Sequence, residues 1–168
     1  YDFRKNDIMH NGNGAPLTPI FHDLLYKKYN LKNTAFINLG GISNLTIKKK
    51  GKLIAFDCGP CCYAIDEFIR NKKNINYDKN GYFASKGYPD YKIILDILKH
   101  PYFKKKYPKS LDRLDINFKT LNKLTLTDGL ATINEFIAEN LNSSLKKFSN
   151  DIKKVVLLGG GRKNIDLV

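Results

Sequence analysis

The chain has 168 residues, which is enough for one domain with its own hydrophobic core or for a part of a larger protein. Its formal net charge of +13 comes from 25 lysines but only 4 arginines, and because arginine makes the better paired contacts with phosphates and bases, this composition argues against a nucleic-acid partner. No apolar run approaches the roughly 18 residues of a membrane span and no secretory signal is recognisable, so no membrane partner and a cytoplasmic location are expected.

The first part of the sequence alternates helix and strand patterns. Residues 1–15 are expected to form a loop, because Asn and Gly punctuate them. An amphipathic helix is expected from residue 17 or 18 to about 29, and its apolar face consists of Ile20, Phe21, Leu24 and Leu25. Three strands are then predicted, over residues 34–39, 42–48 and 52–56. A helix from about 60 to 71 follows them.

The second part contains more helix than strand. Residues 72–123, rich in Lys, Asn, Tyr and Asp, are expected to form a mostly helical insertion with one clear helix at about 89–99. A long helix is predicted from about 127 to 147, because four apolar residues recur there at helical spacing: Leu130, Ile133, Ile137 and Leu141. A strand at 155–158 then leads into glycines and a last helix. This order predicts a mixed α/β layer, with three antiparallel strands and one parallel strand covered by helices.

Three glycine-bearing turns each follow a predicted strand: Gly40-Gly41, Asp57-Cys58-Gly59-Pro60 and Gly159-Gly160-Gly161. A glycine turn lets backbone N–H groups approach phosphate oxygens, because no Cβ intervenes. Three such turns in one α/β chain favour a nucleotide bound in a cleft, and the last turn would add a helix N-terminus. The candidate nucleotide-binding residues are Asn38, Gly40, Gly41, Asn44, Gly59, Gly159, Gly160, Gly161 and Asn164.

Each candidate also has a purely structural explanation. Gly40-Gly41 could be only a hairpin turn, and Asp57 could cap the helix after Gly59 as readily as it could hold a metal. The three histidines have no metal-ligand spacing with the cysteines, so packing or surface roles are expected for them.

The cysteines open a different reading. Cys58-Gly59-Pro60-Cys61 matches the Cys-Gly-Pro-Cys motif of thioredoxins and precedes a predicted helix, whose N-terminus would lower a thiol pKa. A thiol–disulfide oxidoreductase using Cys58 and Cys61 is therefore the alternative function. Against it, a three-strand meander precedes the motif and no Trp stands before Cys58.

A series of short motifs runs through nearly the whole chain. In order they are Asp2-Phe3-Arg4, Gly14-Ala15-Pro16-Leu17-Thr18-Pro19-Ile20-Phe21-His22, Asn38-Leu39-Gly40-Gly41-Ile42-Ser43-Asn44-Leu45-Thr46, Phe56-Asp57-Cys58-Gly59-Pro60, Asp78-Lys79-Asn80-Gly81, Pro101-Tyr102-Phe103, Pro108-Lys109-Ser110 and Gly159-Gly160-Gly161-Arg162-Lys163-Asn164. Together they resemble the C-terminal half of the anhydro-N-acetylmuramic acid kinases. The family's usual Asp-Thr-Gly-Pro-Gly-Asn is replaced here by Asp57-Cys58-Gly59-Pro60-Cys61-Cys62.

This resemblance implies a single domain over 1–168 with an actin/hexokinase/Hsp70-like (ribonuclease H-like) half-domain fold. It implies an ATP-dependent sugar kinase in which Asp2 is the catalytic base, although Asp2 alone could equally cap a turn. Arg4 and Gly14 would lie near the sugar, and ATP and Mg²⁺ would be required, with metal ligands unknown. The expected partners are the amino sugar, ATP and an N-terminal half with the Gly-Thr-Ser-x-Asp-Gly phosphate loop, without which we expect no activity. A homodimer is left open.

Overall fold

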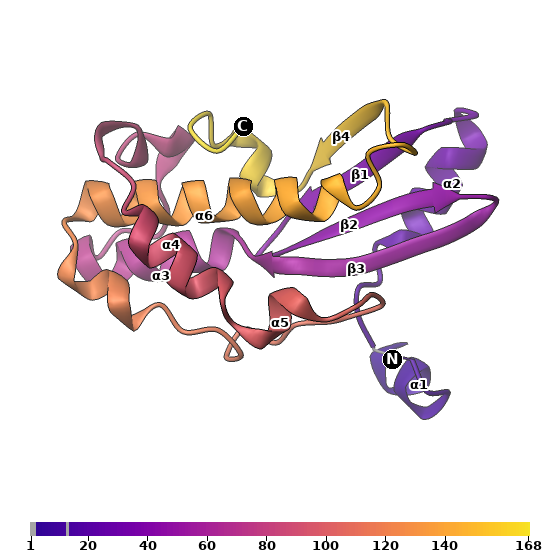
Figure 1. Cartoon of the computed structure of the whole chain (residues 1–168), viewed down its shortest axis with the longest axis horizontal. Helices are drawn as coiled ribbons and strands as arrows, with labels where there is room; N and C mark the ends of the chain where they lie inside the picture. Colours follow the sequence, from indigo (N-terminus) through magenta and orange to yellow (C-terminus); the bar gives the residue numbers. More distant parts are fainter. Residues whose placement is uncertain (1–2, 13) are drawn as a thin grey trace.

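The computed structural model describes residues 3–12 and 14–168, and a four-stranded mixed sheet forms its centre (Figure 1). The strands are β1 (Thr34–Leu39), β2 (Ile42–Lys49), β3 (Lys52–Pro60) and β4 (Lys154–Leu158), and they lie in the order β3-β2-β1-β4. β1 and β3 both run antiparallel to β2, whereas β4 runs parallel to β1. The predicted mixed sheet is therefore confirmed.

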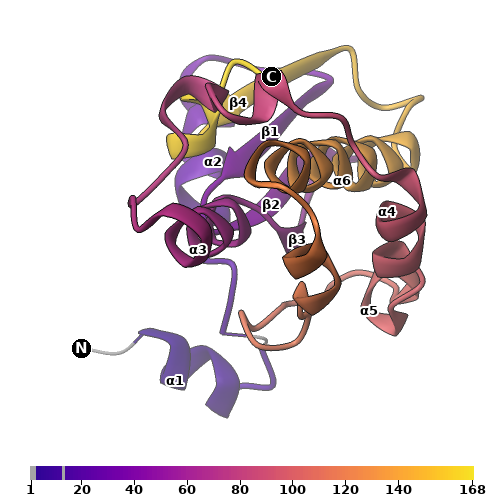
Figure 2. The ribbon, with the colours of Figure 1, turned by 90° about the vertical axis from the view of Figure 1, so that its left-hand side faces the viewer.

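Helix α6 (Leu126–Lys146) runs along one face of this sheet, and α3 (Cys62–Lys73) packs against α6 near the end of the strands (Figures 1 and 2). The two helices and the sheet enclose the main hydrophobic core. Alternate residues of β1 point into this core, and the predicted apolar stripe of α6 is buried as expected. The Thr125 hydroxyl starts α6 by accepting a hydrogen bond from the Asp128 N–H at 3.1 Å. Burial of each aliphatic side chain contributes about 1.5–3 kcal/mol to the stability of the fold. The packed helices therefore fix the ends of the strands in place.

A third helix, α2 (Pro19–Lys28), covers the other face, but not with the side that the sequence predicts. His22 and Tyr26 are buried, and both rings pack on Phe36 of β1 with centroids 4.8 and 5.0 Å away. Of the predicted apolar face, Ile20, Phe21 and Leu24 are 71%, 57% and 58% exposed. The predicted orientation was wrong, because ring packing and hydrogen bonds to the strands orient this helix instead.

Three other boundaries differ from the prediction. Helix α1 (Phe3–Met9) occupies part of the expected N-terminal loop. β3 continues through Pro60 because residues 57–60 pair with β2 around a bulge, so α3 begins only at Cys62. The expected last helix is the short 3₁₀ helix η4 (Gly160–Lys163).

The segment 72–123 consists of short helices and turns. They are η1 (Lys79–Gly81), η2 (Ala84–Lys86), α4 (Tyr91–Leu98), α5 (Pro101–Lys104) and η3 (Lys119–Lys123). α4 confirms the predicted helix and packs against α6. That this segment is an insertion into the domain stays a prediction. Among the described residues, no helix combines the length and apolar character needed to cross a lipid bilayer.

Candidate functional site

Two of the predicted glycine turns lie against each other at the end of the sheet where β1 and β4 finish. Gly159 has φ +82°, and a Cβ built on it would lie 2.6 Å from the Leu39 carbonyl oxygen. A Cβ on Gly161 would lie 2.7 Å from the Leu39 Cβ. The fold therefore requires glycine at 159, and this requirement brings the 159–161 turn onto the end of β1.

Asn38 lies between the two glycine turns. Its Oδ1 is 2.7 Å from the position of a Cβ on Gly159, and its Nδ2 is 3.2 Å from that of a Cβ on Gly40. The side chain is only half-buried, and its amide has no hydrogen-bond partner within residues 3–12 and 14–168. A ligand held between the turns would therefore meet a free amide donor and acceptor.

The Gly40-Gly41 turn caps α3 with its carbonyls. The Cys62 N–H donates to Gly40 O at 3.0 Å, and the Cys61 N–H donates to Gly41 O at 2.9 Å. The N-terminus of α3 is thereby satisfied and is not open to a phosphate. Because the C=O and N–H of a trans peptide point in opposite directions, the Gly41 N–H points away from this helix.

Gly41 and Gly160 differ from the other glycines of the site, because the fold leaves room for a side chain at both. Neither has φ in the left-handed region. A Cβ on Gly41 would make only ordinary contacts, the nearest at 3.5 Å from Nη2 of Arg113, and a Cβ on Gly160 would meet nothing within 4 Å. Their backbones are open to close approach by another molecule.

A row of polar side chains crosses the sheet next to the turns. Asn38, Asn44 and Asp57 occupy paired positions on β1, β2 and β3. The buried Asn44 accepts a hydrogen bond from the Thr18 hydroxyl at 3.1 Å, and the buried Asp57 accepts one from the Leu111 N–H at 3.1 Å. Asp57 therefore ties down the loop at 111 and does not cap α3, which corrects the capping alternative.

The electrostatics of Asp57 connect α1 with this row. Burial raises the pKa of the Asp57 carboxyl, whereas the hydrogen bond from Leu111 and the charges of Arg4 and Lys109 oppose this shift. Arg4, predicted to be near the sugar, is thus close enough to act on the sheet end. Asp2, the predicted base, lies outside the described residues.

Three predicted residues have structural roles that explain them without a ligand. A Cβ on Gly59 would lie 2.6 Å from Nδ2 of Asn140 on α6, so close packing accounts for that glycine. The buried Asn164 accepts from the Leu167 N–H at 3.2 Å. Gly14 has φ +66° and donates its N–H to Asp7 Oδ2 at 2.7 Å. Their proposed contacts with nucleotide or sugar stay predictions.

Sequence reasoning missed a groove of about 780 Å³ near the 159–161 turn. It lies where the η1 turn meets the chain after η4, through a 3.3 Å hydrogen bond from the Ile165 N–H to Asn80 O. Tyr77, Tyr82 and Phe83 line it, which suits a flat ring. The signal available in the sequence was the Asp78-Lys79-Asn80-Gly81 motif, whose distance along the chain from residues 164–166 hides their contact.

Arg113 was also missed. Its guanidinium stands next to Gly41, and the Tyr63 hydroxyl donates to its carbonyl at 2.8 Å. Among only four arginines, an arginine facing an open backbone turn is a natural partner for a phosphate oxygen. Within the described residues no cluster of three or more His, Cys, Asp or Glu that could hold a metal is found.

The cysteines do not form a redox centre. Cys58 and Cys61 are both unexposed and free, and burial raises the pKa of the Cys58 thiol to about 12. Cys62 has a lowered pKa, caused mainly by its hydrogen bond with Cys61, but its thiol is half-buried and donates to Leu39 O at 3.5 Å. Because a reactive cysteine needs an accessible thiolate, the oxidoreductase alternative has no support.

Comparison with known proteins adds an independent finding. The sequence model of the family described as anhydro-N-acetylmuramic acid kinase matches residues 1–168. The chain is 37% identical to the protein of that name from Zymomonas mobilis subsp. mobilis, covering 99% of this chain and 46% of the relative. It is 36% identical to anhydro-N-acetylmuramic acid kinase 2 of Jannaschia sp., covering 100% and 45%. A Rhizobium rhizogenes relative is 36% identical, covering 98% and 45%. The chain spans about half the length of these curated relatives.

Proposed function

The chain belongs to the anhydro-N-acetylmuramic acid kinase family, and from this premise we propose that the whole protein is an ATP-dependent kinase for 1,6-anhydro-N-acetylmuramic acid. Water opens the anhydro ring while the sugar O6 takes the γ-phosphoryl group, which gives N-acetylmuramic acid 6-phosphate for cell-wall recycling. The observation that carries this proposal is the junction of the two glycine turns, with the Asn38 amide between them.

We further propose that the chain is one half of an actin/hexokinase/Hsp70-like fold. Three facts support this finer assignment: the antiparallel meander β1-β2-β3, the parallel strand β4, and the helices on both faces. In such a half, nucleotide lies at the strand ends. The glycine turns lie at that end of the sheet.

The nucleotide would lie across these two turns, with its phosphates at Gly40-Gly41 and its adenosine end at the 159–161 turn. The outward Gly41 N–H, the Asn38 amide and Arg113 provide hydrogen-bond donors for phosphate oxygens. The open backbone at Gly160 and the groove lined by Tyr77 and Tyr82 fit the ribose and base. Mg²⁺ would be held largely by phosphates and water, as is usual for this ion.

Asp2 would serve as the base. An ionised carboxylate accepts a proton from the water that attacks the anomeric carbon, and the C1–O6 bond breaks. The released O6 attacks the γ-phosphorus, the bond from that phosphorus to the β,γ-bridging oxygen breaks, and ADP leaves. Support comes from Arg4, two residues further on, whose charge acts on Asp57 in the polar row. An N-terminal half and a homodimer stay predictions as partners.

The test is an assay of the full-length protein with the Asp2→Asn change, which keeps the size of the side chain but removes the base. We expect kcat to fall by about 10²–10⁴-fold, the usual contribution of a general base. The product, a sugar 6-phosphate, is followed by mass spectrometry. Asp96→Asn on the exposed side of α4 is the matched control and should leave kcat unchanged. Unchanged activity in Asp2→Asn would remove Asp2 from the mechanism.

A further inference from the structure

Lys109 is the only lysine that is buried within the described part of the chain, at 7% exposure. Its Nζ donates to Tyr102 O at 3.1 Å and lies 4.2 Å from the centre of the Tyr102 ring. Among the described residues, no carboxylate comes within 4.0 Å of this ammonium group. The Asp57 carboxyl acts on Lys109 only from beyond this distance. Buried charges are normally paired directly, so a cation whose direct contacts are a carbonyl and a ring needs explaining.

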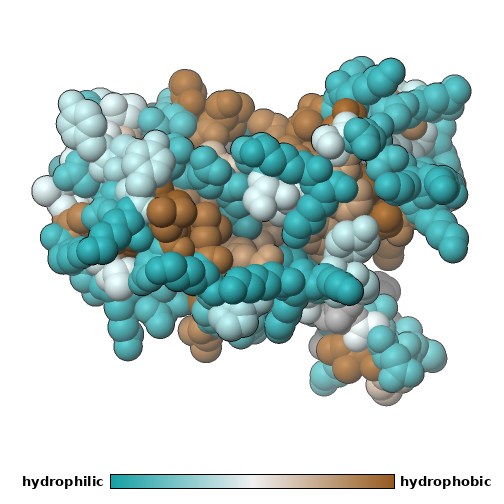
Figure 3. Space-filling view, in the orientation of Figure 1, coloured by the Kyte–Doolittle hydropathy of each residue, from teal (hydrophilic) through white to brown (hydrophobic). Residues whose placement is uncertain are grey.

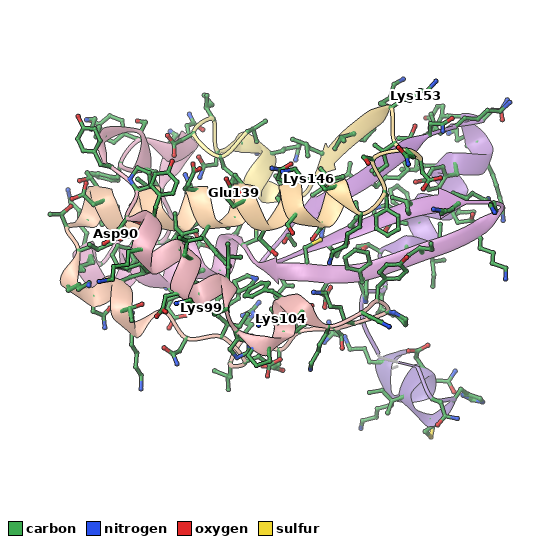
Figure 4. All side chains as sticks on the ribbon, in the orientation of Figure 1. Asp90, Lys99, Lys104, Glu139, Lys146 and Lys153 are labelled. Carbon is green, nitrogen blue, oxygen red and sulfur yellow. The ribbon has the colours of Figure 1, made fainter. Side chains whose placement is uncertain are left out.

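Three more lysines line one hollow of about 420 Å³ together with Lys109. Lys104 comes from the end of α5, and Lys146 and Lys147 come from the end of α6 (Figure 4). Figure 3 shows hydrophilic side chains gathered over both elements on this face. The one acidic residue among the lining residues is Glu139, which is exposed and pairs with none of the lysines.

The local electrostatics favour an anion over solvent alone. Burial, and then the charge of Lys147, lower the pKa of Lys109 to about 8, so this side chain remains mostly protonated at neutral pH. The C-terminal end of α6 carries only about half a negative charge, which cannot offset four ammonium groups. The hollow therefore has a positive potential that an incoming anion would neutralise.

A second polar group at the hollow lacks a partner. Asn140 lines the hollow, and its Nδ2 is buried without a hydrogen-bond partner among the described residues. In its present orientation this nitrogen faces Gly59. Because the two ends of an amide have nearly the same shape, a half-turn of the Asn140 side chain would turn the donor away from Gly59.

From this arrangement we propose that the hollow between α5 and the end of α6 binds a phosphate-type oxyanion, either free or as the phosphoryl group of a small metabolite. Lys109 would donate to it from the floor, and Lys104, Lys146 and Lys147 from the rim. The site is separate from the Gly40-Gly41 and 159–161 turns, and backbone contacts connect it with Asp57 in the polar row. The Asp57 N–H donates to Lys109 O at 3.0 Å, and the Tyr102 hydroxyl donates to Asp57 O at 2.6 Å.

The test uses the full-length protein with a saturating non-hydrolysable ATP analogue, so that phosphate cannot be counted at the nucleotide site. Inorganic phosphate and glucose 6-phosphate are titrated separately by calorimetry. We expect saturable binding that Lys109→Met weakens at least ~10-fold, the loss of one charge-assisted hydrogen bond. Tighter binding of one probe identifies free phosphate or a phosphoryl metabolite as the source.

Two further variants keep the test decisive. Lys146→Gln changes an exposed rim lysine, so it should fold normally and weaken binding ~3-fold or more. Lys153→Gln is the matched control, because Lys153 is exposed and lies before β4, away from the hollow (Figure 4). The proposal is overturned if neither probe saturates below about 50 mM, or if Lys153→Gln weakens binding as much as Lys146→Gln and Lys109→Met do.

Discussion

At Gly159 the fold itself demands glycine, whereas at Gly41 it does not, and this difference between two residues can be measured. Gly159→Ala puts a Cβ 2.6 Å from Leu39 O at φ +82°, so we expect it to lower the free energy of unfolding by roughly 1–3 kcal/mol. A Cβ at Gly41 makes only ordinary contacts, and the branched side chain of Gly41→Val would cover the outward N–H. We expect it to keep the unfolding midpoint and to weaken binding of an ATP analogue about tenfold.

Urea unfolding and calorimetry of the two variants separate the roles. For the unfolding measurement alone, Gly160→Ala is the control for added volume without a contact, because nothing lies within 4 Å of its Cβ position. Equal loss of stability in Gly41→Val and Gly159→Ala would mean that both turns are only structural. That result would leave the proposed phosphate contact at Gly41 without support.

Lys109 predicts a pH dependence of stability. Its pKa of about 8 in the folded state is below the usual value of about 10.4, so the unfolded chain binds the proton more tightly. Lys109 therefore costs stability below pH 8, and the cost disappears as pH rises from about 8 to about 10. We expect Lys109→Met to raise the free energy of unfolding at pH 7 by up to about 3 kcal/mol, and by much less at pH 10.

The measurement is urea unfolding of both proteins in buffers without phosphate or sulfate, which would otherwise stabilise the parent if the hollow binds them. Taking the difference between the two proteins removes the titrating groups on which Lys109 does not act. The Cys58 thiol does interact with Lys109, but its pKa of about 12 lies above this pH range. If the stability advantage of Lys109→Met over the parent grows between pH 8 and pH 10, the burial of a charged Lys109 is contradicted.

At the scale of elements, the orientation of α2 on the sheet can be tested with two tyrosine variants. The buried Tyr26 hydroxyl donates to Thr34 O at 2.6 Å, so Tyr26→Phe should cost about 1 kcal/mol of stability. Tyr29→Phe is the matched control, because Tyr29 lies just after the same helix and is 60% exposed. Thermal unfolding that ranks these two variants in the reverse order would show that α2 packs differently.

The same helix shows where sequence reasoning reaches its limit. The stripe of α6 was predictable, because both α6 and its partners bury aliphatic residues at a regular spacing. The buried face of α2 was not predictable, because its buried rings belong to His22 and Tyr26, which hydropathy does not mark as interior. β3 was predicted too short for a related reason: Cys58 is fully buried inside a bulge, and a Gly-Pro pair usually signals a turn.

At the scale of the site, the sequence located both glycine turns but not their contact. Motif reasoning named Gly41 and Gly159, which lie more than a hundred residues apart, and only the parallel pairing of β1 with β4 brings them together. It also assigned Gly59 and Asn164 to the nucleotide, although packing against α6 and a local hydrogen bond account for them. Spacing alone does not tell whether a glycine leaves room for a ligand or for a neighbouring side chain.

For the whole molecule, the kinase reaction should require more than these 168 residues. In the proposed function the glycine turns would form one wall of the nucleotide site, and the curated relatives are about twice as long as the stretch that matches. We expect residues 1–168, expressed alone, to form no sugar 6-phosphate above background, whereas the full-length protein forms it readily. The readout is mass spectrometry of the sugar, with cooperative thermal unfolding as proof that the isolated chain is folded. Turnover by the folded isolated chain would show that one wall is sufficient.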